Sequence, residues 1–152
     1  MKYYVLLVFI LSFWQTAKGQ NQTLDSLFSV YKNHSKKDVK TIDLWNEIAW
    51  EFNVVNIDST RHYAKLALNS AKEEKYFNGQ IRAFNLLAIY YSYQNKIDSA
   101  ISLNSKALEL SLKHDLLEHQ SSLYNDLAID YGLKGDYEKS LDYYYEALEV
   151  LS

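Results

Sequence analysis

The stretch NDLAIDYGLKGDYEKSLDYYYEALEVLS, residues 125–152, decides the fold. Two runs rich in Leu, Ala, Tyr and Glu flank the segment Gly-Leu-Lys-Gly at residues 132–135. The runs have the composition of helices, and glycine commonly marks the end of one helix and the turn into the next. The stretch therefore predicts two helices joined by a short turn.

The same unit occurs earlier in the chain. When Gln80 is laid on Gln120, nine positions between 80 and 109 fall on identical residues between 120 and 149. A weaker copy precedes them, and its match slips by one position in the turn before Ile57. Self-similarity at a fixed period is typical of repeat architectures, in which each unit packs on its neighbours. The sequence therefore predicts three copies of one helical hairpin.

Small residues occupy matching positions in both helices of every copy. They are Ala49, Ala88 and Ala128 in the first helices, Thr60, Ala100 and Ser140 early in the second helices, and Ala67, Ala107 and Ala147 two turns later. Two helices approach to about 8–10 Å only where small side chains meet. Each copy is therefore predicted to be a closely packed helix pair.

Acidic and aromatic residues add two local predictions. Asp58, Asp98 and Asp136 each precede a second helix, where a carboxylate can accept hydrogen bonds from the free N–H groups of the helix start. The three tyrosines at 143–145 cannot share one helix face, because consecutive residues point about 100° apart. Tyr144 is predicted to take the packing position, and its neighbours are expected to meet solvent or a following repeat.

This pattern resembles the tetratricopeptide repeat family. In the third copy, the residues on the family's spacing are Tyr124, Leu127, Ala128, Tyr131, Gly135, Tyr137, Ser140, Leu141, Tyr144 and Ala147. In the second copy they are Phe84, Leu87, Ala88, Tyr91, Ile97, Ala100, Ile101 and Ala107. The family's period of about 34 is stretched here to about 40, its boundary proline is absent, and its glycine at the first close contact is alanine. The resemblance covers roughly residues 41–152 and is specific for fold rather than for function.

The predicted fold is all-α, an α-solenoid of antiparallel helix pairs with an N-terminal capping helix. The capping helix and a polar junction are assigned to residues 20–40, and the repeat region 41–152 is divided at about 41–76, 77–114 and 115–152. The helices are expected near 22–35, then in pairs near 38–53 with 57–74, 77–94 with 97–113, and 116–133 with 137–152. The last repeat would expose its joining face, so the repeat region is expected to be incomplete at the C-terminus, in a fragment of a longer protein.

Residues 1–19, MKYYVLLVFILSFWQTAKG, look like a secretory signal peptide. Lys2 precedes an almost unbroken apolar run at 3–14, and Ala17 and Gly19 are the small residues that a signal peptidase needs before Gln20. A helix of that length spans about 18 Å, too little for a bilayer core of about 30 Å. Export to the periplasm or the extracytoplasmic face of a bacterial membrane is therefore predicted, with an uncleaved membrane anchor as the alternative.

Composition narrows the class of partner. Removal of residues 1–19 takes away Lys2 and Lys18, so that 14 of the 16 basic residues remain beside 19 acidic ones, a net charge of −5. A phosphate backbone requires a basic surface, so nucleic acid is not an expected partner of this segment. The chain has no cysteine, so its stability cannot come from disulfides and must come from packing.

The resemblance implies that the first helix of each pair lines a concave groove. The residues that would face it are Asp43, Asn46, Trp50 and Asn53, then Arg82, Asn85, Ile89 and Ser92, then Ser122, Asn125 and Ile129. The three asparagines at 46, 85 and 125 could pair with an extended peptide backbone, with Trp50 as an apolar anchor. The alternative is that they bind neighbouring helices and keep the stack in register. Arg82 is the only basic candidate and Asp43 opposes it, which argues against capture of a terminal carboxylate.

No pattern indicates catalysis or a cofactor. In the segment KHDLLEH, His114 and Glu118 are separated by one helical turn, as are Asp115 and His119. Neither pair has a third ligand, and the segment lies at an expected bend, so a solvated junction is favoured over a metal site. The sequence contains no nucleophile motif and no phosphate-binding glycine loop. We therefore predict a protein that is not an enzyme and needs neither metal nor cofactor.

Two functional hypotheses follow from the resemblance. The first is an exported scaffold that binds a protein or peptide through its concave face. The second is the N-terminal extracytoplasmic sensor region of a membrane-bound histidine kinase or related regulator, continued beyond residue 152 by further repeats and a membrane helix. A purely structural spacer is a third, weaker alternative.

Overall fold

The computed structural model describes residues 22–34, 36 and 38–151, and the chain divides into two units after Ser35. In the first unit, residues 22–33 form a helix, close to the lead helix expected near 22–35. Its function as a cap on the repeats stays a prediction. The signal peptide assigned to residues 1–19 lies outside the described residues.

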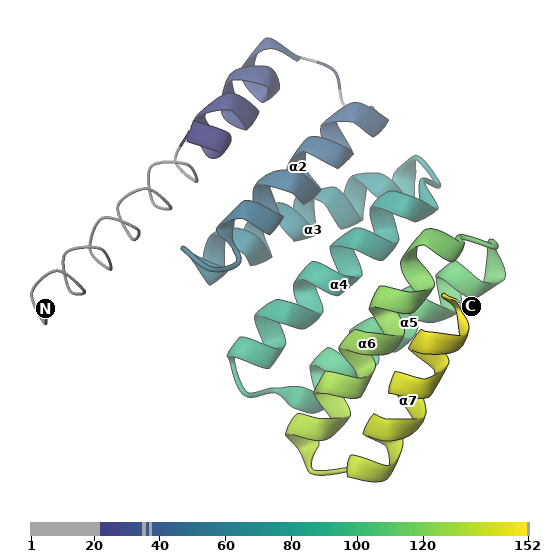
Figure 1. Cartoon of the computed structure of the whole chain (residues 1–152). Helices are drawn as coiled ribbons and strands as arrows, with labels where there is room; N and C mark the ends of the chain where they lie inside the picture. The colour runs from purple at the N-terminus through teal and green to yellow at the C-terminus, as the bar shows by residue number, and fades with distance from the viewer. Residues whose placement is uncertain (1–21, 35, 37, 152) are drawn as a thin grey trace, which may run out of the picture. The chain divides into compact units, whose positions relative to one another are not determined.

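The second unit consists of six helices that follow one another through short turns (Figure 1). They are α2 (Val39–Phe52), α3 (Ile57–Glu73), α4 (Phe77–Tyr93), α5 (Ile97–Lys113), α6 (Leu117–Lys134) and α7 (Tyr137–Glu149). These bounds confirm the predicted helices to within a few residues, and residues 22–34 and 38–151 contain no strand. None of the helices in the described ranges combines the length and the hydropathy needed to span a membrane.

The way the helices touch gives the stack its curvature. Each helix packs on the next one in the chain, and α2 also contacts α4, as α4 contacts α6. The second helices α3, α5 and α7 make no comparable contacts with one another within this unit. The first helices of the pairs approach each other, whereas the second helices spread apart. Helices α2, α4 and α6 therefore lie on the inner side of the curved stack. This arrangement is the all-α solenoid that the sequence predicts.

A turn of constant geometry follows four successive helices and explains the long period. Lys75, Asn95, Asp115 and Gly135 have positive φ angles of 54°, 56°, 53° and 87°. In each turn the next residue donates its N–H to a carbonyl near the end of the preceding helix, as Tyr76 does to Ala71 at 2.8 Å. This is the Schellman motif, which satisfies carbonyl groups at a helix end. The four turns are evenly spaced along the sequence, so a repeat of two helices extends from Lys75 to the equivalent Asp115.

The small residues meet where the sequence places them. The Thr60 hydroxyl donates to the carbonyl oxygen of Ala49 at 3.1 Å, and the Ser140 hydroxyl donates to that of Ala128 at 2.7 Å. Ala100, which holds the same position in the second pair, is fully buried and has no hydroxyl to donate. Threonine or serine can therefore replace alanine where the two helices of a pair pack closely, because the hydroxyl donates to a carbonyl of the facing helix.

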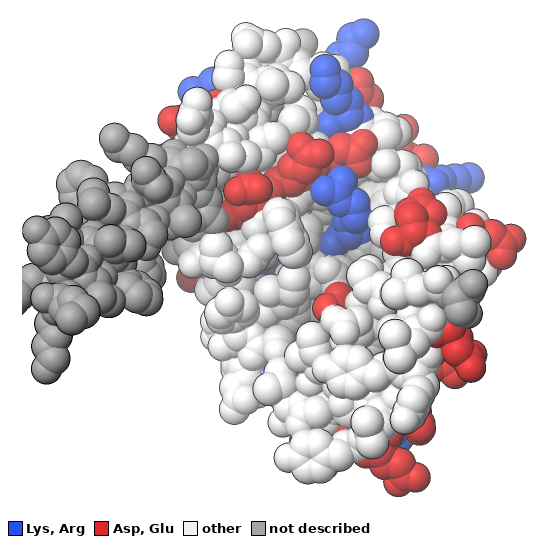
Figure 2. Space-filling model, viewed as in Figure 1, with Lys and Arg blue, Asp and Glu red and all other residues white. Residues whose placement is uncertain are grey.

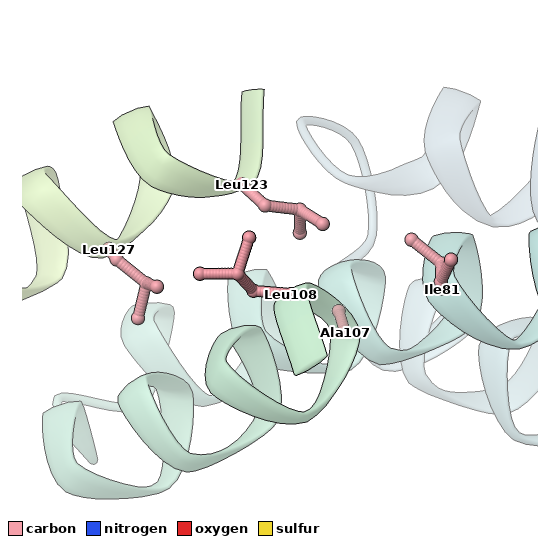
Figure 3. Packing of buried hydrophobic residues seen from close by; sticks show 5 residues of the cluster. All are labelled: Ile81, Ala107, Leu108, Leu123 and Leu127. Atoms are coloured by element: carbon pink, nitrogen blue, oxygen red, sulfur yellow. The ribbon is translucent and has the colours of Figure 1, made fainter. Parts of the chain in front are cut away.

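Larger apolar side chains fill the space between successive pairs. One cluster joins Ile81 of α4, Ala107 and Leu108 of α5, and Leu123 and Leu127 of α6. Figure 3 shows the side chain of Leu108 between those of Leu123 and Leu127 of α6. Burying a leucine of this kind stabilises the fold by roughly 1.5–3 kcal/mol, so each helix pair depends on the neighbour that covers it.

Two local predictions need correction. Asp136 caps α7 by accepting from the N–H of Lys139, as predicted, but Asp58 and Asp98 lie inside the first turn of their helices. Asn56 caps α3 in place of Asp58, accepting from the N–H of Ser59 at 3.1 Å. A carboxylate in the first turn can still favour the helix by interacting with its dipole.

The packing tyrosine of α7 is Tyr143 and not Tyr144. Tyr143 stacks on Tyr131 with ring centroids 5.3 Å apart. Tyr144 and Tyr145 are 40% and 66% exposed. The three rings indeed do not share one face. The ring that packs against Tyr131, however, belongs to Tyr143, one residue before the predicted Tyr144.

Candidate functional site

The inner side of the stack contains a cavity of about 350 Å³ between α2, α4 and α6. We call it the groove cavity. It is lined by Asn46, Trp50, Ile81, Arg82, Asn85, Leu86, His119, Ser122, Leu123 and Asp126. Five of these, Asn46, Trp50, Arg82, Asn85 and Ser122, are among the residues predicted for the concave groove. First helices of all three repeats therefore contribute to one hollow.

The other predicted groove residues lie outside its lining. Asp43 stands beside it, where its carboxylate is 3.9 Å from the guanidinium of Arg82. Asn53 ends α2 and donates from its side chain to the carbonyl of Trp50. The remaining four are not part of the cavity: Ile89 and Ser92 are half-buried on α4, and Asn125 and Ile129 are exposed on α6.

Glycine allows α4 to approach α2 closely at one edge of the cavity. A Cβ atom on Gly79 would lie 2.7 Å from Cγ2 of Ile42, a distance that real Cβ atoms do not show. This approach brings the carbonyl oxygen of Gly79 within 3.1 Å of Nδ2 of Asn46, which donates to it. Asn46 is fully buried, and its Oδ1 has no hydrogen-bond donor among the described residues. Buried acceptors usually have a partner, so this oxygen is an exception among the described residues.

Asn85 connects three helices at the other edge. Its Nδ2 donates to Oδ2 of Asp126 on α6 at 2.7 Å and lies 3.1 Å from Oδ1 of Asn104 on α5. Asn104 in turn donates to Oδ2 of Asp130 at 2.8 Å. These four residues, which we call the Asn–Asp network, link α4, α5 and α6 through charged and amide groups inside the stack.

Burial changes the acidity of both carboxyl groups in the Asn–Asp network. It raises the pKa of Asp126, and the hydrogen bond from Asn85 opposes that rise. Burial also raises the pKa of Asp130 to about 6, with the bond from Asn104 opposing and the charge of Asp126 adding to the rise. Removal of water from a carboxylate disfavours its charged form. The network is therefore sensitive to pH just below neutrality.

Donor groups gather at the opposite end of the groove cavity. Arg82 faces Asp43, and that carboxylate also accepts a hydrogen bond from the hydroxyl of Tyr76 at 3.0 Å. Nε2 of His119 lies 3.3 Å from Oδ1 of Asn78. Burial lowers the pKa of His119, the charge of Glu118 opposes this shift, and the charge of Arg82 adds to it, so the imidazole is largely neutral at pH 7.

The comparisons agree with this architecture. The tetratricopeptide repeat profile matches residues 121–151. The TPR domain of Arabidopsis FLU superposes with a TM-score of 0.58 at 22% identity, covering 87% of this chain and 97% of that domain. The described repeats therefore share the fold of a tetratricopeptide repeat domain, and the stretch 121–151 matches the repeat family itself. BtubC (BKLC) from P. vanneervenii superposes on this domain with a TM-score of 0.66 at 19% identity, covering 88% of the chain.

These similarities concern the fold of the TPR domain. The alignment takes in 54% of BtubC, so the chain spans about half the length of that protein. No curated protein sequence matches the chain.

Within the stack of repeats, the predicted row of asparagines occupies three different environments. Asn46 is buried, Asn85 belongs to the Asn–Asp network, and Asn125 is exposed. The amide nitrogens of Asn46 and Asn85 are bound to protein acceptors, as the register hypothesis requires. A role for the row in binding a peptide backbone stays a prediction.

Sequence reasoning missed Asp126 and His119 as lining residues. Asn125 was chosen because it is identical to Asn85 when the two copies are aligned, but the carboxylate that meets Asn85 is one position further on. A signal was present, since Asp126 and Asp130 stand where the preceding repeat has the buried residues Leu86 and Tyr90. An acidic residue at a position that is apolar in the other copy marks a place where the repeat has been adapted.

The KHDLLEH segment does not form the helical geometry that a metal pair would need. Residues 114–116 are the turn between α5 and α6, so neither His114 with Glu118 nor Asp115 with His119 lies on one continuous helix. His114 stacks on Phe77 with ring centroids 3.6 Å apart. Within the described ranges, no group of three or more His, Cys, Asp or Glu side chains could hold a metal ion.

Proposed function

We propose that this TPR domain binds an extended segment of a partner protein in the groove cavity between α2, α4 and α6. The observation that carries the proposal is Trp50, which is 55% exposed although it lines a cavity formed by three repeats. Exposed aromatic rings beside polar groups are frequent anchors at protein interfaces, since they bury much area with little loss of side-chain entropy.

The chemistry of the lining supports a segment of protein over a catalytic substrate. Ile81, Leu86 and Leu123 provide apolar surface, while Asn85 and Ser122 bring polar groups to the same hollow. A few polar groups placed among apolar ones fix the position of a ligand without reacting with it. On the face shown in Figure 2, acidic side chains lie beside the basic ones, a mixed surface unlike that of a nucleic-acid-binding face.

Export of the chain is part of the proposal. It is supported by the apolar run after Lys2 and by the small residues before Gln20. Expression of the whole chain in a bacterium, followed by cell fractionation and N-terminal sequencing, tests it. A mature protein that begins at Gln20 in the periplasmic fraction is expected. An intact N-terminus in the membrane fraction would favour the anchor, and with it the sensor hypothesis.

The binding proposal is tested with a random peptide library displayed on phage and the full chain as target. Peptides selected by the wild type should lose at least tenfold in affinity for Trp50→Ala, measured by titration calorimetry. The matched control is Tyr145→Ala, which removes an aromatic ring 66% exposed on the second helix α7 and should leave affinity unchanged. Binding that depends on Tyr145 and not on Trp50 would overturn the groove as the binding site.

A further inference from the structure

The two ends of the groove cavity have opposite chemistry. Arg82 and His119 stand at one end, and Asp126 is two turns along α6 from His119, about 10 Å at roughly 1.5 Å of rise for each position. Asp126 supplies carboxylate oxygens there as acceptors. A ligand group that fills this second end must therefore bring hydrogen-bond donors.

We propose that this acceptor end is a pocket for a lysine or arginine side chain of the bound segment. The inference rests on the proposed function and specifies the chemistry that the groove selects. A cavity of about 350 Å³ is at the small end of ligand pockets, which suits one long side chain better than a whole small molecule.

The wall of the cavity fits the aliphatic stem of such a side chain. Ile81, Leu86 and Leu123 form its floor but are at most 3% exposed, so most of the apolar surface open to a ligand is that of Trp50. The ring of Trp50 is open to solvent beside them. Lysine and arginine bury their stems on apolar surface and place their charge near aromatic faces, where the ring quadrupole attracts the cation.

The carboxylate of Asp126 fits the charged head. It accepts a hydrogen bond from Asn85 and forms no ion pair with a side chain in the described ranges. An ionised carboxylate can accept about four hydrogen bonds, so most of its capacity is unused. A buried charge without a counter-charge is unfavourable, and a cationic ligand would remove that cost.

An anionic ligand is disfavoured by the same residues. The charge of Arg82 is opposed by Asp43 at 3.9 Å, and burial lowers the pKa of His119, so that it adds little positive charge at pH 7. The acidic excess of the chain after residue 19 also attracts basic segments and repels acidic ones. The groove therefore lacks the convergent cations that capture of a carboxylate needs.

The test uses four peptides, acetyl-Ala-Ala-Xaa-Ala-Ala-amide, with lysine, arginine, norleucine or glutamate as Xaa. Each is titrated into the isotope-labelled full chain at pH 7, and amide and indole shifts are followed by NMR. The lysine and arginine peptides should shift the signals of Asn46, Trp50 and Asp126, with a dissociation constant at least fivefold lower than that of norleucine. Norleucine has the stem of lysine without its charge.

Two variants test separately the contact with the charged group of the lysine and the contact with its aliphatic part. Asp126→Asn should reduce the preference for lysine over norleucine to less than twofold, whereas Asp142→Asn, an exposed acid on α7, should leave it unchanged. Trp50→Ala should weaken the lysine and norleucine peptides alike. Thermal unfolding of each variant shows whether the stack remains intact.

Several outcomes overturn the basic pocket. Equal binding of norleucine and lysine in the groove would do so and would leave the proposed function standing. Tighter binding of glutamate, or a lysine preference that survives Asp126→Asn, would also contradict it. Absence of groove shifts with every peptide overturns the pocket, and the Trp50-dependent library selection then decides separately whether the groove binds protein segments at all.

Discussion

Helices α5 and α7 occupy the same place in successive repeats, yet their side chains meet different surroundings. The buried residues are Ala100, Asn104, Ala107, Leu108 and Ser111 in α5, but only Ser140 and Ala147 in α7. Leu108 is 8% exposed, whereas its equivalent Leu148 is 63% exposed. The helix α6 packs on α5, while no described helix covers the corresponding side of α7.

The difference teaches that burial in this domain belongs to the contact between repeats and not to the residue. The same leucine at the same position of the repeat is core in one helix and surface in the other. Solenoid stability is accordingly a sum of the stability of each repeat and of the interfaces between neighbours. Four sets of substitutions test this difference between α5 and α7, and they follow in order of expected effect.

The largest difference is expected between alanine substitutions of the two equivalent leucines, Leu108 and Leu148. Leu108→Ala should lower the free energy of unfolding by about 2–4 kcal/mol, because it deletes buried apolar contacts and leaves a cavity. Leu148→Ala should change it by less than about 0.5 kcal/mol, because most of that side chain is in water. Urea unfolding followed by circular dichroism measures both. Equal losses would mean that α7 is covered in solution.

The next effect concerns Asp130, the carboxyl group of α6 that meets Asn104 of α5. When the two repeats are aligned, Asn104 corresponds to Tyr144 of α7, which is 40% exposed, so the Asn–Asp network exists only at the covered helix. Burial raises the pKa of Asp130 from 3.8 to about 6 in the folded state. Its contribution to stability is therefore fully present below pH 4 and is lost as pH rises through 6.

Asp130→Asn removes this titration and keeps a hydrogen-bonding side chain beside Asn104. Relative to the wild type, the variant should gain about 2 kcal/mol of stability between pH 4.5 and pH 8, following the size of the pKa shift. Urea unfolding at a series of pH values measures the difference. The control Asp142→Asn, on the exposed side of α7, should track the wild type. Parallel curves for Asp130→Asn and wild type would contradict the assigned burial.

A smaller effect is expected at the close contact within each pair. Ser140 of α7 donates to the carbonyl of Ala128, and α5 has Ala100 at the same position. Ser140→Ala should cost about 1 kcal/mol, the net value of a typical hydrogen bond. Ala100→Ser should introduce the equivalent hydrogen bond, from the new hydroxyl to the carbonyl of Ala88. It should raise the free energy of unfolding by a fraction of about 1 kcal/mol, as measured by urea unfolding. Loss of stability on Ala100→Ser would show that α4 and α5 pack more tightly than α6 and α7.

The helices and their pairing could be predicted from the sequence, because small and apolar residues recur at fixed positions and act locally. The positive φ of Lys75 could not, since lysine carries no preference for that conformation. The pairings within the Asn–Asp network could not be predicted either. Asn104 stands where the other repeats have Ala64 and Tyr144, which marks an altered position but does not show which side chain it meets.

The inward ring of α7 and the lining of the groove cavity were each displaced by one residue. Tyr144 was chosen from the family's spacing and Asn125 from identity between copies, and neither criterion shows which side of the helix meets a neighbour. Tyr143 and Asp126 take those places instead. A helix turns by about 100° per residue, so an error of one residue moves a side chain from one neighbour to another. Five lining residues were nevertheless predicted from the sequence: Asn46, Trp50, Arg82, Asn85 and Ser122.

The smallest effect is expected in the turns that lead into α5 and α7, and it should not differ between them. Asn95 and Gly135 both have positive φ, and a Cβ atom on Gly135 would meet nothing within 4 Å. Asn95→Ala and Gly135→Ala should each cost about 0.5–1 kcal/mol, because alanine is strained in this conformation whatever surrounds it. Thermal unfolding of the two variants measures this. Turn strain is local, whereas burial depends on a neighbouring repeat. If Asn95→Ala proved several times more costly than Gly135→Ala, the turns too would depend on coverage, and the contrast between α5 and α7 would extend to the whole repeat.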